Sequence, residues 1–154
     1  MTYGRRSENE VLDTINGFFE AAREKDMDAL ADAHGHRNAF TKFDAFPPYT
    51  LQSSDTAIAY EEAVFANISD LKFKVEDPRV TVVGETAVAA FFLKISGIFV
   101  YDYSFEGRPV DLRLRVTMVL AREEGRWIII HEHLSELKDM KGEAGPAEAW
   151  RPRR

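Results

Sequence analysis

The sequence contains no cysteine, and this absence removes several kinds of chemistry at once. Disulfide bonds, thiolate metal sites and a cysteine nucleophile are all excluded. Long apolar runs are missing as well, because none reaches the roughly 18 residues that a membrane-spanning helix needs. The first ten residues, MTYGRRSENE, lack the apolar centre of a signal peptide. We therefore expect a cytoplasmic protein with no membrane partner.

The chain also lacks an excess of positive charge. Its formal net charge is −6 at pH 7, whereas affinity for nucleic acid comes mainly from clustered lysine and arginine. We therefore expect no nucleic-acid partner. GxSxG, P-loop and dinucleotide-binding motifs are absent too. The 154 residues suit one domain, which we place at residues 1–137 and follow with a flexible tail at 138–154.

The first third of the chain has the periodicity of helices. Ser7 and Glu10 have the spacing of a capping box, and the apolar residues after them predict a helix that ends near Lys25. Asp26 can cap a shorter second helix. A third helix is expected to open at Ser54 or Asp55, with an apolar stripe of Ala57, Tyr60, Val64 and Ile68.

The segment between the second and third helices, residues 38–52, is irregular and rich in aromatic side chains. Loops of this composition often close over pockets. We expect the part from Phe40 to Tyr49 to act as a lid.

From Leu71 onward the period becomes that of strands. Pro78 favours an edge position or a bulge in the first strand, and Gly97 favours a bend in the long strand expected from Ala87 to about Phe105. Helices followed by a curved antiparallel sheet make an α+β domain.

The strongest pattern is the hairpin DLRLRVTMVLAREEGRWIIIHEHLS, residues 111–135. A three-residue loop at 123–125 would pair Arg115 with His133 and Thr117 with His131. Because side chains alternate along a strand, one face would collect Arg113, Arg115, Thr117, Val119, Trp127, Ile129, His131 and His133. One face of this hairpin should line a pocket under the helices, and the other should meet a second subunit, giving a homodimer.

Three stretches, FFEAAREKDMDALADA, GETAVAAF and RVTMVLAREEGRWIIIHEHLS, resemble the nuclear transport factor 2-like superfamily over roughly residues 8–137. The last one is similar to the ending of its SnoaL-like branch and of the calcium/calmodulin-dependent kinase association domain. The resemblance implies a cone-shaped fold, shared with ketosteroid isomerase, in which three N-terminal helices pack on the curved sheet. It leaves the activity open, because this superfamily includes isomerases, cyclases, dehydratases, epoxide hydrolases and oligomerisation domains.

The candidate catalytic residues are His131, His133 and Arg115. Imidazoles titrate near neutrality and can act as a general base or a donor, and the guanidinium of Arg115 could hold a ligand carboxylate or an enolate. Structural alternatives stay open: the histidines could simply bond a neighbouring strand, and Arg115 could pair with Asp44, Asp102 or Glu132. The candidate substrate-binding residues are Phe43, Tyr49, Tyr60, Tyr101, Asp102 and Trp127.

All four histidines occur in two His-x-His pairs, so His34, His36, His131 and His133 could form a divalent-metal site if the pairs converged. Our main hypothesis has no metal or other cofactor. It is a cofactor-free lyase, isomerase or cyclase acting on an apolar carbonyl compound. The alternative is a binding or oligomerisation module that holds a small apolar or anionic organic ligand without turnover.

Overall fold

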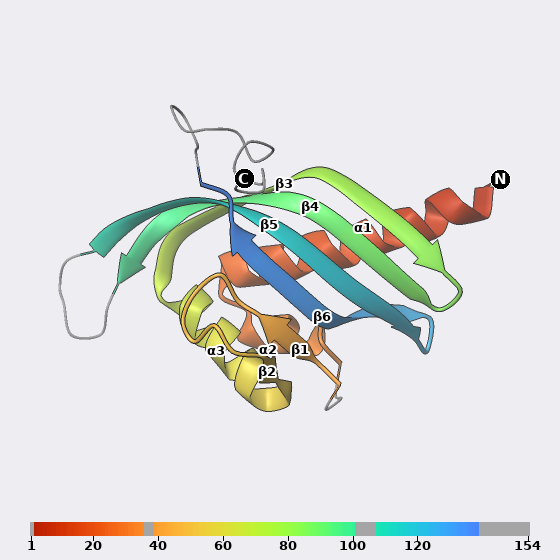
Figure 1. Cartoon of the computed structure of the whole chain (residues 1–154), viewed down its shortest axis with the longest axis horizontal. Coiled ribbons are helices and arrows are strands. Elements are labelled where there is room, and N and C mark those ends of the chain that lie inside the picture. The colour runs from red at the N-terminus through yellow and green to blue at the C-terminus, as the bar shows by residue number, and fades with distance from the viewer. Residues whose placement is uncertain (1, 36–38, 101–106, 139–154) are drawn as a thin grey trace, which may run out of the picture.

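The computed structural model describes residues 2–35, 39–100 and 107–138. It contains three helices and one six-stranded sheet, with strand order β2-β1-β6-β5-β4-β3. The helices are α1 (Thr2–Glu24), α2 (Met27–Asp32) and α3 (Ser54–Ala66); the strands are β1 (Thr41–Phe43), β2 (Gln52–Ser53), β3 (Ile68–Val83), β4 (Thr86–Val100), β5 (Gly107–Glu123) and β6 (Arg126–Glu136). The sheet is strongly curved, and α1 runs across one of its faces (Figure 1). The α+β class is confirmed.

Helix α1 begins earlier than the sequence predicts. The expected capping box at Ser7 is wrong, because the helix already runs from Thr2 and the Glu10 carboxylate pairs with Arg6, one turn before it, at 3.3 Å. The end is confirmed: Lys25 adopts a positive φ of 61°. The Asp26 side chain then caps α2 by accepting a hydrogen bond from the Ala29 amide at 3.1 Å.

The face of the sheet under the helices, called the inner face below, carries the core. Leu114, Val116, Met118 and Leu120 of β5 alternate inward into the core. The same core contains Val11, Ile15, Phe18 and Ala22 of α1, which are buried at the predicted helical spacing. The apolar stripe of α3 differs from the prediction. Its buried residues are Ala57, Glu61 and Phe65, whereas Tyr60 is 46% exposed.

The edge position and the bulge predicted for Pro78 are both confirmed. Strand β3 is the last strand of the sheet, and its pairing with β4 shifts between Glu76 and Arg79. A second shift, between Ser69 and Lys72, lies opposite Gly97. A Cβ atom at Gly97 would lie 2.5 Å from Ile68 Cγ2, so this glycine lets the bulged backbone approach closely.

The β5–β6 hairpin is present, but its register differs from the prediction. Its turn has two residues, Glu124 and Gly125, both with positive φ. An extra residue, Ile130, forms a bulge where the pairing shifts between Val119 and Leu120.

Because of the bulge and the shorter turn, the predicted cross-strand pairs and the predicted faces are both wrong. His131 pairs with Val119, His133 with Thr117, and Ser135 with Arg115. Trp127 and Ile129 lie on the inner face with Leu120, whereas His131 and His133 lie on the opposite, outer face. The predicted face mixed the two sets because it assumed unbroken alternation.

The segment predicted to be irregular contains two short strands. Strand β1 pairs in parallel with β6, and Lys42 stands beside Glu132 in that register. Strand β2 pairs antiparallel with β1, so the sheet is mixed and not purely antiparallel. The predicted end of the long strand at Phe105 lies outside the described ranges, and so does the predicted tail at 138–154 apart from Lys138. None of the described helices combines the length and apolarity needed to span a bilayer.

Candidate functional site

Four ionisable side chains meet beneath the inner face of the sheet. They come from separate parts of the chain: His34 follows α2, Lys42 lies on β1, Glu61 on α3 and Glu132 on β6. All four are at least 96% buried. Charged groups are rarely buried at all unless they are paired, so this cluster, called the inner cluster below, is the most unusual feature of the molecule.

Local structure explains how each side chain reaches the cluster. Glu61 occupies the buried stripe of α3, four residues after Ala57 and four before Phe65. Lys42 and Glu132 face inward together because β1 and β6 pair in register. His34 is held by its backbone, whose amide donates to the Ala31 carbonyl at 3.1 Å in the turn that ends α2.

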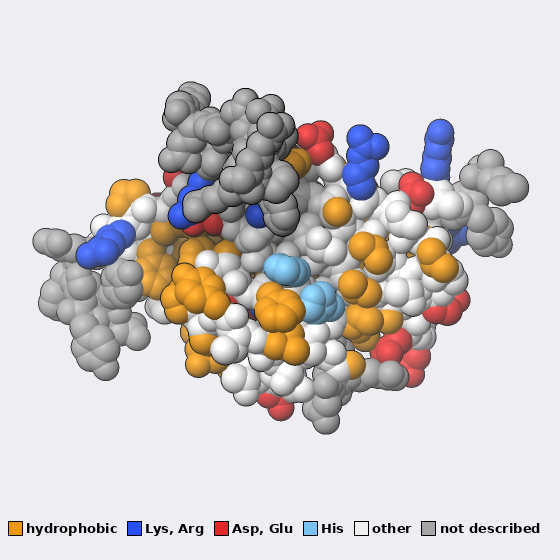
Figure 2. Space-filling model, in the orientation of Figure 1, with side chains coloured by type: hydrophobic (Ala, Val, Ile, Leu, Met, Phe, Trp, Pro, Cys, Tyr) orange, Lys and Arg blue, Asp and Glu red, His pale blue; other side chains and the backbone are white. Residues whose placement is uncertain are grey.

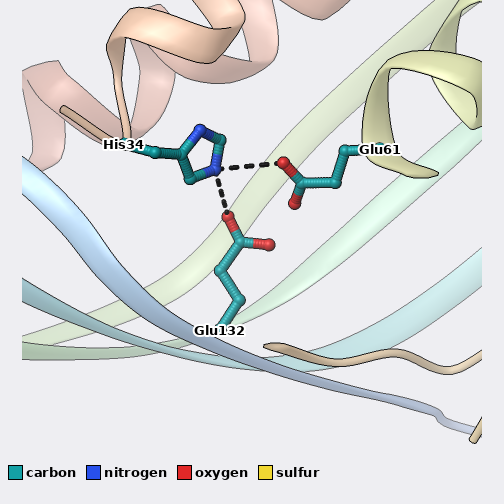
Figure 3. A group of neighbouring side chains, drawn as sticks. All are labelled: His34, Glu61 and Glu132. Carbon is teal, nitrogen blue, oxygen red and sulfur yellow. Dashed lines mark hydrogen bonds and ion pairs between the residues drawn. The ribbon is translucent and has the colours of Figure 1, made fainter. Parts of the chain in front are cut away.

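The two carboxylates of the inner cluster lie between two cationic groups. On one side Lys42 Nζ is 2.8 Å from Glu61 Oε1 and 3.5 Å from Glu132 Oε2. On the other side His34 Nε2 is 3.0 Å from Glu61 Oε2 and 3.4 Å from Glu132 Oε1 (Figure 3). Each carboxylate therefore meets a nitrogen at both of its oxygens, which offsets much of the cost of burial.

The surroundings move all four pKa values. Burial lowers the pKa of His34, but its hydrogen bonds to Glu132 and Glu61 outweigh this and raise it to about 10. Burial and the nearby charge of Glu61 raise the pKa of Glu132 to about 7. For Lys42, the charges of Glu61, Glu132 and Asp44 overcome the effect of burial and raise the pKa.

Glu61 responds in the opposite direction from Glu132. Burial alone raises its pKa, but the charge of Lys42 and the hydrogen bonds from its neighbours hold the pKa well below its ordinary value. Near neutral pH Glu61 is therefore ionised and Glu132 is about half protonated. With Lys42 and His34 charged, the positive charge of the four side chains is at least as large as their negative charge.

A pocket of about 580 Å³ opens beside the inner cluster. Its wall is mainly apolar and comes from α3, β4, β5, β6 and the segment after β1. It includes Phe46, Pro47, Val64, Phe65, Ile95, Leu112 and Leu134. Lys42, Asp44 and Glu61 form a polar end. Asp44 Oδ2 lies 3.4 Å from Lys42 Nζ, and the Asp44 side chain is 9% exposed, compared with 1% for Glu61.

This arrangement can transfer protons to and from an apolar molecule. An ammonium group at the end of a dry pocket stabilises negative charge that develops on a substrate oxygen. A neighbouring carboxylate can take or return a proton. Both groups are present within hydrogen-bonding reach of the same pocket end.

A divalent cation is the other chemistry that the inner cluster has donors for. His34, Glu61 and Glu132 each offer a ligand atom, and these atoms lie within 4.8 Å of one another. Imidazole and carboxylate would suit Zn²⁺ or Mn²⁺. However, Lys42 contacts both carboxylates, and its charge together with that of His34 already balances them, which disfavours a further cation.

The catalytic candidates from sequence lie on the outer face. His131 Nδ1 is 2.7 Å from Thr41 Oγ1, and burial together with the charge of His133 lowers the pKa of His131. Arg115 Nε donates to Ser135 Oγ at 3.1 Å. His133 and Arg115 line one hollow in this face, so the structure brings these two together, but not at the inner pocket.

The two histidine pairs do not come together among the described residues. His34 contacts Glu61 and Glu132 on the inner side, whereas His131 bonds Thr41 on the outer face. His36 lies outside the described residues.

The aromatic candidates separate in a similar way. Phe43 is 37% exposed and packs its ring 5.3 Å from that of His133. Tyr49 and Tyr60 are 70% and 46% exposed, whereas Trp127 is buried in the core. None of the four lines the inner pocket, and Tyr101 and Asp102 fall outside the described residues. The expected lid segment does supply Phe46 and Pro47 to the pocket wall.

Sequence reasoning missed Lys42 and Glu61. One signal for Glu61 was available: it stands at i+4 from Ala57 and i−4 from Phe65, so it falls on the apolar side of a predicted helix. Glu132 was considered only as an ion-pair partner for Arg115. Lys42 carried no such signal, because β1 is three residues long and its pairing with β6 is distant in sequence.

Comparisons with known proteins agree with this architecture. The profile of the SnoaL-like domain matches residues 11–139. A Streptomyces avermitilis protein of the NTF2-like family, proposed to be a dehydratase, superposes with a TM-score of 0.72 at 19% identity, covering 88% of this chain and 99% of the other. No protein of curated function matches the chain significantly.

Oligomerisation domains share the fold as well. The association domain of the C. elegans kinase CaMKII superposes with a TM-score of 0.69 at 14% identity, covering 88% of this chain and 99% of the other. An NTF2-like protein from Pseudomonas putida has a TM-score of 0.69 at 20% identity, covering 91% and 93%. The cone-shaped fold implied by the sequence is thereby confirmed.

Proposed function

The chain belongs to the SnoaL-like domain family of the NTF2-like superfamily, and we propose that it is a cofactor-independent lyase or isomerase acting on an apolar carbonyl compound. The observation that carries the proposal is the polar end of the inner pocket. There an ammonium group, Lys42, and a partly accessible carboxylate, Asp44, lie 3.4 Å apart in a largely apolar wall.

In this proposal the carbonyl oxygen of the substrate accepts a hydrogen bond from Lys42. The Asp44 carboxylate removes a proton from the carbon next to the carbonyl, and the electron pair moves to the oxygen, which forms an enolate. Lys42 stabilises that negative charge. Asp44 then returns the proton to a different carbon in an isomerisation, or to a leaving group in an elimination.

Asp44 is assigned the proton transfer because it is the most exposed carboxylate of the group. Glu61 and Glu132 hold Lys42 in place and keep it charged, so Lys42 acts as a hydrogen-bond donor and not as a Schiff-base nucleophile. His131, His133 and Arg115 have no part in this chemistry, since they lie across the sheet from the pocket.

The proposal can be tested without the natural substrate. The probe is 2-tetralone, an apolar ketone with acidic α-protons, and the measurement is its deuterium exchange in D₂O followed by NMR. We expect the protein to accelerate exchange. The Asp44→Asn substitution should lower the accelerated rate roughly 10²–10⁴-fold. The matched control is Asp111→Asn, an exposed aspartate outside the inner pocket. Equal rates for wild type and Asp44→Asn would contradict the proposal.

A second candidate function, oligomerisation, rests on the outer face. Apolar side chains are exposed on its strands, with Val88 42%, Ile98 40% and Phe43 37% accessible, and Figure 2 shows apolar and imidazole side chains gathered on this side of the molecule. Similarity to CaMKII association domains favours it too. Light scattering at micromolar concentration is the test: we expect a homodimer that Val88→Glu converts to monomer.

A further inference from the structure

The outer face contains a hollow of about 680 Å³ that has no role in the proposed proton transfer. Its floor follows a single row of paired residues across four strands: Arg79 pairs with Ala90, Ala90 with Thr117, and Thr117 with His133. The small side chain of Ala90 leaves space between the longer ones. Arg115 and Ser135, which pair in the next row, complete the wall.

Arg115 is oriented within this hollow but not neutralised. Its Nε donates to the Ser135 hydroxyl at 3.1 Å, which fixes the plane of the guanidinium and leaves its two terminal nitrogens without an acidic partner among the described residues. Arg79 likewise forms no ion pair within the described ranges. Two guanidinium groups therefore face one space with most of their donors unused.

The neighbouring Arg113 shows what a neutralised arginine on the same strand looks like. It lies 3.8 Å from a Glu76 carboxylate oxygen and stacks over the Phe92 ring at 4.7 Å. It does not line the hollow. Arg113 and Arg115 are two residues apart on one face of β5. The guanidinium of Arg113 is engaged by protein groups, whereas that of Arg115 keeps donors that a ligand can use.

Donors dominate the polar lining. Thr117 and Ser135 contribute hydroxyl groups and His133 contributes an imidazole, while Asp77 is the single acid of the lining. The hollow is thus locally positive in a chain whose formal net charge is −6. That overall charge repels large polyanions, so the size of the ligand is limited to a small molecule.

We propose that this hollow binds the oxyanion of a small organic acid, a carboxylate or a phosphate monoester, between Arg79 and Arg115. The fork of a guanidinium matches both groups through two parallel hydrogen bonds. Thr117 and Ser135 are within the same lining to hold a third oxygen, and the ring of Phe92 borders the space in which the body of the ligand lies.

The experiment is an NMR titration of the isotope-labelled full chain with phenyl phosphate and, separately, with sodium benzoate. Sodium chloride at equal ionic strength serves as the reference. We expect saturable shifts at Thr117, His133 and the Arg115 side chain with at least one of the two acids. Saturation by phenyl phosphate alone identifies a phosphate site, and saturation by benzoate alone or by both identifies a carboxylate-accepting one.

Three variants decide whether the hollow is responsible. Arg115→Gln and Arg79→Gln should each weaken binding about ten-fold, because each removes charge-assisted hydrogen bonds. Arg113→Gln is the matched control and should leave binding within about two-fold, since its guanidinium is already engaged.

The proposal is overturned if neither acid saturates, or if Arg113→Gln weakens binding as much as Arg115→Gln does. Binding that is lost in Asp44→Asn, with Arg115→Gln unchanged, would place the acid in the inner pocket and also overturn it. The result does not depend on whether 2-tetralone exchanges its protons.

Discussion

Strand β6 presents two environments within three residues. Glu132 points to the inner face, is buried, and has its pKa raised to about 7. His131 and His133, on either side of it, point outward, where His131 bonds a threonine and His133 is exposed. Residue type alone therefore does not identify a reactive group, because the face on which an ionisable side chain lies determines how far its surroundings shift its pKa.

The same contrast holds for the cations. The buried Lys42 contacts three carboxylates at 2.8–3.5 Å, whereas the exposed Arg115 bonds one hydroxyl group. An ammonium held by carboxylates at the end of a dry pocket is fixed in position before any substrate arrives. An unpaired guanidinium in contact with water instead keeps donors for a ligand. We therefore assign the proposed proton transfer to the inner face and the proposed recognition of an organic acid to the outer face.

The largest expected effect tests the buried side of this comparison. Lys42→Met removes the ammonium between Glu61 and Glu132 and leaves their charges without that partner, so we expect the free energy of unfolding to fall by about 3–5 kcal/mol. Urea denaturation is the measurement. Lys94→Met, at an exposed position of β4, is the control and should change stability by less than about 0.5 kcal/mol. Equal losses would remove the distinction between the faces.

The next effect concerns pH. Glu132 binds its proton with a pKa of about 7 when folded and has an ordinary value of 4.5, so the folded state holds more protons between these values. Its contribution to stability is full below pH 4.5 and is lost as the pH rises to about 7, by on the order of 3 kcal/mol. His34 acts in the same direction between 6.5 and about 10.

The Glu132→Gln substitution separates the pH dependence of stability that Glu132 causes from the part that His34 causes. Denaturation curves from pH 4.5 to 7 should show a declining stability for wild type and a flatter profile for the variant, since glutamine does not titrate. At pH 4.5 the two proteins should be similar in stability. An unchanged slope in the variant would show that Glu132 is not the group that titrates.

A smaller effect is expected for the partly buried bond on the outer face. His131→Asn removes the contact with Thr41 and should cost about 1 kcal/mol, the usual net value of one hydrogen bond. A double-mutant cycle with Thr41→Val should return a coupling of similar size. If the two single substitutions simply add, the hydrogen bond contributes nothing to stability.

The smallest effect should come from a partly exposed ion pair on the outer face. Arg113 and Glu76 are 48% and 28% exposed at their side chains, so Arg113→Gln should change the free energy of unfolding by less than about 1 kcal/mol. In roughly 0.5 M salt this change in stability should be smaller still, because dissolved ions screen surface charges. A loss as large as that of Lys42→Met would contradict the division between faces.

Much of the fold was predictable because it follows from local patterns. The end of α1 near Lys25, the cap at Asp26, the bulge at Pro78 and the hairpin around Gly125 all depend on residues close in sequence. The start of α1 was not predictable from Ser7 and Glu10, since Glu10 is used by Arg6. Beyond this, the profile match and the structural superpositions confirm the fold implied by the resemblance.

The inner cluster was much harder to predict. Its members are separated by up to 98 positions, the spacing of His34 and Glu132, and they meet only through the parallel pairing of β1 with β6. That pairing depends on a strand of three residues, too short to give a period. The histidine pair drew attention because imidazole is a familiar catalytic group, while the glutamate between the two histidines carries the stronger perturbation.

The bulge at Ile130 has a consequence for how the pocket can be altered. It allows Ile129 and Glu132 to share a face although three positions separate them, and bulges also bend the strand that contains them. Removing Ile130 would restore regular alternation with Ile129 and Glu132 both still facing inward. Such a deletion would straighten β6 without changing its inward side chains, whereas replacing Glu132 changes the chemistry without changing the path of the strand. The curvature of β6 and the polar groups that it presents to the inner face can therefore be altered separately.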